Sequence, residues 1–247
     1  MSQFSRLRLV DPALLPDVWR VDELAAQETV LPSGHPLLDR YLPGGGWPVG
    51  SMVEVLQQRA GQHVWQLVLP ALAQAITRQA GPVVLVGAPY EPFGPSLRVQ
   101  GLPPERLLCV RAEKPAARLW AAEQALRCSE VAAVLAWLPQ AKSAELRRLH
   151  MAAQQQGRLL FVFRGLNARH EASPARLRLL VEGVDTLEVH ILKRRGPPIE
   201  TPLSLPAYSA RLAELLEARK TRLPPAAPPV GPLPRRSHVL DRTAALT

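Results

Sequence analysis

Short apolar segments that alternate with helical patterns constrain the fold of this chain more than any other sequence feature. Most of these segments are not interrupted by polar residues, which is typical of strands buried on both faces of a sheet. We expect strands at Met52–Leu56, Pro82–Val86, Leu107–Val110, Val131–Trp137, Leu159–Phe163 and Leu187–Leu192. Apolar residues at helical spacing predict helices at Val64–Gln79, Ser96–Gln100, Ala116–Cys128, Lys142–Gln155 and Ser173–Val181. Strands joined through helices predict an α/β fold with a mainly parallel, twisted sheet flanked by helices.

The predicted domain organisation follows from a change of pattern at both ends of this alternating region. Residues 223–234 hold six prolines and no helical period, which is typical of a flexible tail. Two apolar stripes at helical spacing flank the core, and they are candidate partner anchors because large apolar side chains dominate interface energetics. These anchors are Val18, Trp19, Leu24, Leu212, Leu215 and Leu216. The expected parts are an N-terminal helical segment over 1–30, a core domain over 31–205, a C-terminal helix over 206–222 and a disordered, Pro-rich tail over 223–247.

Positive charge is concentrated in the C-terminal part of the chain. The formal net charge is +9. Residues 1–141 contribute nothing to it, because their 12 basic side chains are balanced by 12 acidic ones. Residues 142–222 carry 15 basic and 8 acidic side chains, a net charge of +7. Such an excess fits an anionic partner, either nucleic acid or an acidic protein face, and equally fits a solvated basic surface.

The connection between the first predicted strand and its helix is where a phosphate-binding loop would lie. Such a loop reads G-x-x-x-x-G-K-[ST]: its backbone N–H groups close on phosphate, its lysine reaches the outer phosphates and its hydroxyl holds Mg²⁺. The connection keeps Gly61 but contains no lysine, serine or threonine. We therefore predict a degenerate loop without tight nucleotide binding or phosphoryl transfer. Its residues are Gln57, Gln58, Arg59, Ala60, Gly61, Gln62 and His63.

The other predicted strand ends also lack the groups that an ATPase needs. Glu91 is the only carboxylate candidate after the second strand, and we interpret it as a surface turn residue. The strand that ends at Trp137 continues with Leu138, where a metal-holding aspartate would be expected. The six histidines have no metal-ligand spacing. We expect no catalytic residue, no metal, no cofactor and no ATPase activity.

The chain has two cysteines, Cys109 and Cys128, and they have no CxxC spacing. Because both lie in apolar stretches, we expect buried, unreactive thiols rather than a zinc site or a disulfide. No apolar run approaches the length of a membrane span, and residues 1–11 contain no apolar signal region. We therefore expect a cytoplasmic protein.

Several motifs resemble those of known families. The segments Ser33–Asp39, Leu42–Val55 and Ile191–Pro198 are similar to the entry and the basic strand end of the RecA recombinase core. The combination of GGGWP at 44–48, VVLVGAPYEPF at 83–93 and LKRRGPP at 192–198 more closely resembles the ImuA family, which is RecA-like and related to the SulA cell-division inhibitors. The resemblance covers about residues 30–205. It implies an SOS-induced protein of translesion DNA synthesis that works with ImuB, a polymerase-like protein, and with an error-prone DNA polymerase.

The resemblance also implies roles for basic residues. In RecA, two lysines at the matching strand end reach nucleotide across a subunit interface, and Lys193 and Arg195 stand at those places here. Without a phosphate loop, a contact to a partner or to the DNA backbone is the more reasonable hypothesis for Lys193, Arg194 and Arg195. A DNA-binding loop of RecA corresponds to the short connection after Leu159–Phe163, which carries Arg164 and Arg169. These two arginines are further candidates for weak, nonspecific contact with DNA.

The leading hypothesis is a non-catalytic accessory protein that contacts an ImuB-like polymerase homologue, an error-prone polymerase and RecA itself. One alternative is a SulA-like inhibitor of cell division, which shares the fold. Another is a RecA-type ATPase with a divergent loop. The sequence does not distinguish a monomer from a homo-oligomer, and it leaves the stoichiometry of any complex open.

Overall fold

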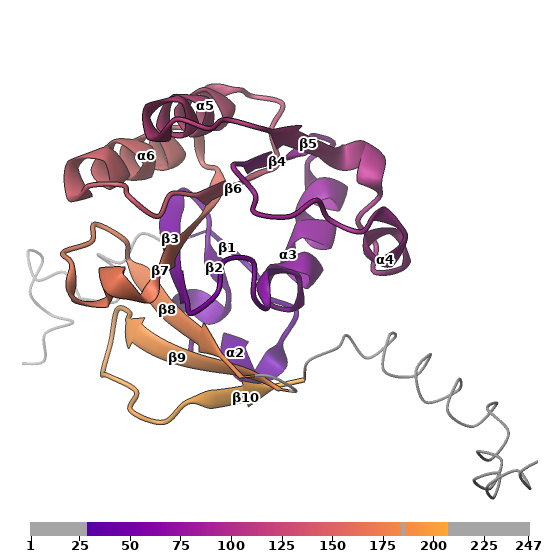
Figure 1. Ribbon diagram of the computed structural model, residues 1–247. Helices are drawn as coiled ribbons and strands as arrows, with labels where there is room; N and C mark the ends of the chain where they lie inside the picture. The colour runs from indigo at the N-terminus through magenta and orange to yellow at the C-terminus, as the bar shows by residue number, and fades with distance from the viewer. Residues whose placement is uncertain (1–28, 184–185, 207–247) are drawn as a thin grey trace, which may run out of the picture. The chain divides into compact units, whose positions relative to one another are not determined.

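The central element of the fold is a large mixed sheet (Figure 1). The computed structural model describes residues 29–183 and 186–206, which all belong to one compact unit. Within these residues the sheet has eight strands in the order β10-β9-β8-β3-β7-β6-β4-β5. The strands are β3 (Ser51–Gln57), β4 (Val83–Val86), β5 (Leu107–Val110), β6 (Ala133–Trp137), β7 (Leu159–Gly165), β8 (Leu177–Glu182), β9 (Leu187–Lys193) and β10 (Leu203–Leu205). The predicted α/β class is confirmed.

Most neighbouring strands run parallel. The six strands from β5 to β8 pair in parallel, whereas β9 pairs antiparallel with β8 and β10 antiparallel with β9. A second sheet consists of the short antiparallel strands β1 (Val30–Leu31) and β2 (Trp47–Pro48). The parallel part explains the unbroken apolar runs, because every residue of β4 and β6 is buried.

Helices cover both faces of the sheet. The α-helices are α2 (Pro36–Asp39), α3 (Val64–Arg78), α4 (Gly94–Val99), α5 (Pro115–Arg127) and α6 (Ser143–Gln156), and the 3₁₀ turns are η2 (Pro43–Gly45), η3 (Pro104–Arg106) and η4 (Leu166–His170). The buried face of α3 packs with strand residues such as Val53 and Leu85. Helices α5 and α6 pack on the opposite face, with residues such as Met52 and Val84. Successive strand residues therefore alternate between two hydrophobic layers.

Helix α3 accommodates a proline in its interior through a contact from outside the helix. Pro70 has no N–H group, so the carbonyl of Gln66 loses its usual partner within the helix. His35 contacts this carbonyl oxygen through Nε2 at 2.9 Å. Gly34 has a positive φ of 83°, and a Cβ atom there would lie 2.2 Å from the Cβ atom of Pro70. The segment before α2 thus packs tightly against the proline and compensates for the missing hydrogen bond.

The predicted helix at Ser173–Val181 is wrong, since most of that segment forms strand β8. Leu177, Leu179 and Val181 face the layer that contains α3, whereas Leu180 lies in a separate small cluster with Leu56 and Ala168. Apolar residues in this arrangement satisfy helical and strand spacing equally. The position between β3 and β9 decides, because both neighbours offer backbone hydrogen bonds along the segment. Ser173 does not cap a helix but accepts the N–H of Ala175 at 3.2 Å.

The expectation of buried thiols is also wrong. Cys109 and Cys128 are both exposed. Cys109 lies on β5, which is the last strand of the sheet in the described residues and is partly solvated. Cys128 follows the last residue of α5. An apolar sequence context did not reveal that one segment is an edge strand and that the other is a helix end.

Candidate functional site

The connection from β3 to α3 lies at the carboxyl end of β3, as a phosphate loop would. Its conformation is fixed by Gln57, whose side chain is buried at the end of the strand. The amide oxygen of Gln57 accepts the N–H of Gly61 at 3.3 Å, and its amide nitrogen donates to the carbonyl of Gln62. The N–H of Gln62 donates in turn to the carbonyl of Arg59 at 3.1 Å. Two N–H groups of the loop are thus bonded within the loop itself.

The same loop is tied to the turn between β8 and β9. The side chains of Gln62 and His63 both contact the carbonyl oxygen of Gly183, each at 2.7 Å. His63 adopts a left-handed conformation (φ 55°) immediately before α3. Gly61 (φ 83°) lies against Pro89 and Tyr90, where an added Cβ would come within 3.1 Å of both side chains. The loop is therefore packed from two sides, and His63 has a structural contact.

Replacing Gln57 with alanine is expected to lower the free energy of unfolding by about 1–3 kcal/mol, because two loop groups lose their buried partner. Urea melts would measure this. The matched control is Gln58→Ala, which removes an exposed amide and should change stability by about 0.5 kcal/mol or less. Equal effects of the two substitutions would show that Gln57 does not fix the loop.

The residues that were singled out at two other strand ends, Glu91 and Trp137, both have partners within the protein. Glu91 is exposed and pairs with exposed Arg111, which agrees with a surface turn residue. Trp137, at the end of β6, stacks on Phe163 with ring centroids 4.7 Å apart. Within the described part of the chain, no three His, Cys, Asp or Glu side chains are grouped as metal ligands would be.

In the same described residues, no helix is both long enough and apolar enough to cross a membrane.

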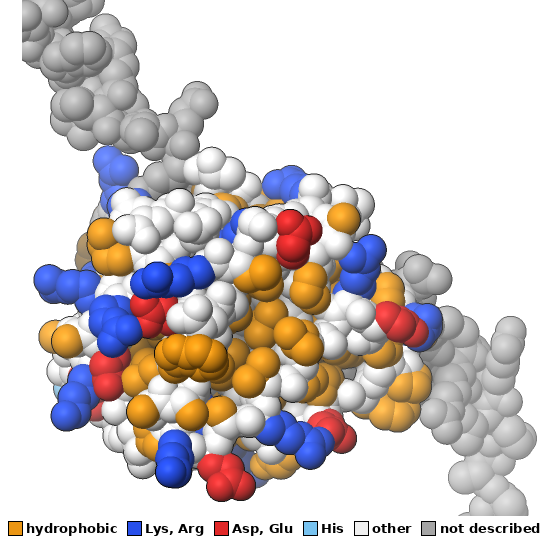
Figure 2. Space-filling model, turned by 90° about the horizontal axis from the view of Figure 1, so that it is seen from above, with side chains coloured by type: hydrophobic (Ala, Val, Ile, Leu, Met, Phe, Trp, Pro, Cys, Tyr) orange, Lys and Arg blue, Asp and Glu red, His pale blue; other side chains and the backbone are white. Residues whose placement is uncertain are grey.

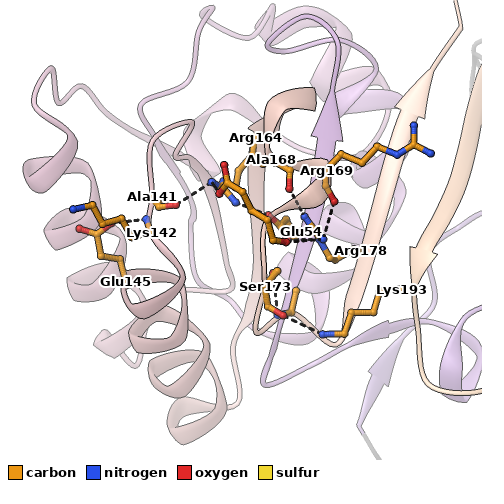
Figure 3. A network of polar contacts seen from close by, with 12 residues as sticks. Glu54, Ala141, Lys142, Glu145, Arg164, Ala168, Arg169, Ser173, Arg178 and Lys193 are labelled. Carbon is orange, nitrogen blue, oxygen red and sulfur yellow. Dashed lines mark hydrogen bonds and ion pairs between the residues drawn. The ribbon is translucent and has the colours of Figure 1, made fainter.

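A buried ion cluster lies on the sheet where only surface arginines were expected (Figure 3). Glu54 of β3 is fully buried and lies between Arg164 of β7 and Arg178 of β8. Its carboxylate pairs with Arg164 Nη1 at 3.1 Å and with Arg178 Nε at 2.7 Å. Arg164 also contacts Glu171 at 2.7 Å and the carbonyl of Ala141 at 2.9 Å.

This cluster corrects the role that we expected for Arg164. Its side chain is only 2% exposed, and its donors point to protein acceptors. Arg178 likewise donates to the carbonyls of Ala168 and Glu171, at 2.8 and 3.2 Å. The two arginines hold the β7–β8 connection on the sheet instead of facing DNA. Arg169, on the 3₁₀ turn of that connection, is exposed and remains a candidate contact.

Glu54 and Arg178 were missed by the sequence analysis. The available signal was a carboxylate in the middle of an otherwise apolar strand, since a buried charge requires a partner of opposite charge. Only the register of the sheet identifies the partners of Glu54. Arg178 on β8 stands opposite Glu54, and Arg164 on β7 stands opposite Leu56, two residues further along β3.

The basic strand end lies away from the loop. Lys193 is paired with Arg178 in the register, near the start of β8, whereas Gln57 is paired with Val181 near its end. A hollow of about 390 Å³ lies at this end of β9. Its charged lining residues are all basic: Arg176, Lys193, Arg194 and Arg195.

The three predicted residues at this strand end differ in accessibility. Lys193 and Arg195 are exposed, and Lys193 donates to the carbonyl of Ser173 at 3.0 Å. Arg194 is half-buried and donates to the carbonyls of Tyr41 and Pro197, at 2.7 and 3.0 Å. The structure therefore brings Lys193 and Arg195 to one accessible surface, while Arg194 ties β9 to the end of α2.

His150 on α6 is a titratable side chain that contacts the start of β3. Its Nδ1 accepts the N–H of Met52 at 3.2 Å, which requires that nitrogen to be unprotonated. Burial lowers the pKa of His150 below its ordinary value of 6.5, and the charges of Arg176 and Lys193 lower it further. The pKa of His35 is also lowered, mainly by burial.

Stability is expected to fall as the pH drops below about 6.5, because the unfolded chain then binds protons that folded His150 and His35 resist. The contribution of both groups is fully present above that pH. Urea melts between pH 8 and pH 5 would give the slope. His150→Gln keeps an acceptor but does not titrate, so its slope should be shallower than that of the native chain. An unchanged slope would contradict the assignment.

The predicted partner anchors lie outside the described residues. They are Val18, Trp19 and Leu24 before the core, and Leu212, Leu215 and Leu216 after it.

Comparison with known proteins points to two related groups. Residues 50–160 match the family described as "Cell division inhibitor SulA". The chain is 35% identical over 135 residues to Protein ImuA from Caulobacter vibrioides. The aligned region covers 52% of this chain and 54% of that protein. It is 32% identical over 107 residues to the cell division inhibitor SulA of Edwardsiella piscicida. The aligned region covers 43% of this chain and 64% of that protein. The chain thus spans about half the length of the ImuA proteins that it matches, and it is similar to both ImuA and SulA.

Proposed function

We propose, from the similarity to ImuA and SulA, that the chain is a non-catalytic, RecA-like accessory protein of damage-induced mutagenesis. It acts in translesion DNA synthesis through contacts with a polymerase-like partner of the ImuB type, with an error-prone DNA polymerase and with RecA. The role in mutagenesis is supported by the similarity to ImuA, and the non-catalytic character is supported by the loop after β3. This loop has no lysine or hydroxyl for a nucleotide, and Gln57 bonds to its backbone groups.

The exposed pair Lys193 and Arg195 is the proposed contact surface for these partners. The hollow beside it has only basic charged residues, so it favours an anionic group. A charge-reversed variant, Lys193→Glu with Arg195→Glu, is expected to lose capture of the polymerase-like partner in a pull-down. The matched control is Arg111→Glu with Arg98→Glu, which alters exposed arginines elsewhere and should retain capture. Equal capture by both variants would exclude this surface.

The cellular role has a direct test. A strain that lacks the gene should show fewer mutations after DNA damage, and the native gene should restore them. Because the loop is proposed to be inactive towards nucleotide, Arg59→Glu, which reverses the charge of an exposed loop residue, should restore mutagenesis as well as the native gene. Mg·ATP turnover above background in the purified native protein, abolished in Arg59→Glu, would instead support the ATPase alternative.

The match of residues 50–160 to SulA supports one second candidate function, inhibition of cell division. Expression of the chain in growing cells separates the two functions. Filamentous cells with unchanged mutation frequency would favour the inhibitor. Normal cell length with restored mutagenesis would favour the accessory protein.

A further inference from the structure

The seam between α5 and α6 forms an open groove on the outer face of the molecule. The groove has a volume of about 640 Å³. Glu123 and Arg127 line it from α5, and Arg147, Arg148 and Met151 line it from α6. Figure 2 views the molecule from the side on which α5 and α6 lie in Figure 1, and it shows hydrophobic side chains gathered on this face with Lys and Arg side chains around them.

The charge of this groove is positive. Its one acidic lining residue, Glu123, is only 10% exposed, and its two oxygens pair with Arg127 and with Arg148. In the part of the chain that the structure describes, Arg147 is exposed and pairs with no carboxylate. The lining therefore offers cationic donors but no accessible carboxylate of its own.

Apolar side chains stand exposed beside these arginines. Met151 is 47% exposed, and Trp120 is 65% exposed one turn before Glu123 on α5. Residues three apart lie on neighbouring positions of a helix surface, so Trp120 lies next to Glu123, which lines the groove. Tryptophan, arginine and methionine are the residue types enriched where proteins bind one another. A solvated tryptophan beside a groove gains free energy when a partner covers it.

We infer that this α5–α6 groove is a docking surface for an acidic amphipathic helix of a protein partner. The apolar side of such a helix would cover Trp120 and Met151, and its carboxylates would face Arg127, Arg147 and Arg148. Helices α5 and α6 have 13 and 14 residues, so the seam is about 20 Å long and matches a helix of similar length. The inference rests on the shape and charge of this face and not on a role in mutagenesis.

The charge of the groove also argues against the chain's own C-terminal part as its occupant. Residues 207–247 carry seven basic and three acidic side chains, so arginines in the groove would repel them. Residues 1–28 carry three basic and five acidic side chains, so they could compete with a partner. A variant without residues 1–28 therefore belongs in the test.

The test uses a fluorescent helical peptide of about 16 residues, with leucines along one side and glutamates beside them, and follows its anisotropy on addition of the full chain. A second peptide has lysine in place of each glutamate. We expect the acidic peptide to bind about tenfold more tightly than the basic one. Trp120→Ala should weaken binding about fivefold or more, and Arg147→Glu about tenfold.

The matched control is Arg78→Glu, an exposed charge reversal at the end of α3 on the opposite face of the sheet, which should leave peptide binding within about twofold of the native value. Circular dichroism would show that each variant is folded. Equal affinity for the two peptides, or no binding of either, overturns the inference. Binding that appears only after removal of residues 1–28 assigns the groove to the chain itself. Displacement of the peptide by a single-stranded oligonucleotide, with loss of oligonucleotide binding in Arg147→Glu, assigns it to nucleic acid.

Discussion

Glu54→Ala is expected to destabilise the protein by about 3–5 kcal/mol, because it leaves Arg164 and Arg178 buried without their shared counter-ion. Glu54 is fully buried, and Arg164 and Arg178, taken as whole residues, are 4% and 8% exposed. The Coulomb attraction within the cluster roughly offsets the free-energy cost of removing its charges from water. When one partner is lost, that cost is no longer offset. Urea melts followed by circular dichroism would measure the change.

Two further variants show whether charge is the cause. Glu91→Ala removes a carboxylate from an exposed ion pair and should cost about 1 kcal/mol or less. Without Glu54, Arg164 still pairs with Glu171, whereas Arg178 loses its carboxylate partner. Adding Arg178→Met to Glu54→Ala removes that buried charge and should recover part of the lost stability. A loss below about 1 kcal/mol for Glu54→Ala would contradict the proposed clamp.

Trp47→Ala is expected to cost about 3–5 kcal/mol, since it removes a fully buried aromatic side chain and leaves a cavity. Trp47 packs edge-on against Phe161 of β7, with ring centroids 5.2 Å apart and planes at 85°. It thereby joins the small β1–β2 sheet to the main core. Thermal or urea unfolding would measure the loss.

Trp47→Phe is the control that separates the aromatic contact from the indole N–H. The Nε1 atom of Trp47 is buried, and it has no hydrogen-bond partner among the described residues. Phenylalanine keeps most of the apolar contact and removes the unpaired donor, so its cost should be clearly smaller than that of alanine. Similar losses for the two substitutions would show that the contact with Phe161 contributes little.

The glycine-rich segment before Trp47 could be recognised from the sequence, but its purpose could not. A run of three glycines after Pro43 predicts a turn, and Gly44 and Gly45 do adopt positive φ values of 73° and 80°. Gly46 has a different reason, because a Cβ there would lie 2.4 Å from the carbonyl oxygen of Leu31. The turn brings β2 beside β1 and directs the indole into the core.

The sequence was a poor guide wherever the answer depended on a partner far along the chain. The segment Ser173–Val181 has an apolar pattern that fits a helix as well as a strand, and only its place between β3 and β9 decides the outcome. Arg164 looked like a surface cation because it follows a predicted strand, but β7 extends to Gly165 and places it beside Glu54. The groove between α5 and α6 had no sequence signal, because its lining residues come from two helices separated by β6.

The sequence by itself determined the α/β class, the approximate positions of most strands and helices, and the lack of lysine and hydroxyl groups in the loop after β3. These features are local, because periodicity and residue type act over a few positions. The tertiary structure alone decided which charges are buried, which end of the sheet Lys193 reaches, and that the Gln57 amide fastens the loop. Those outcomes depend on strand order and register, which bring together residues more than a hundred positions apart, such as Glu54 and Arg164.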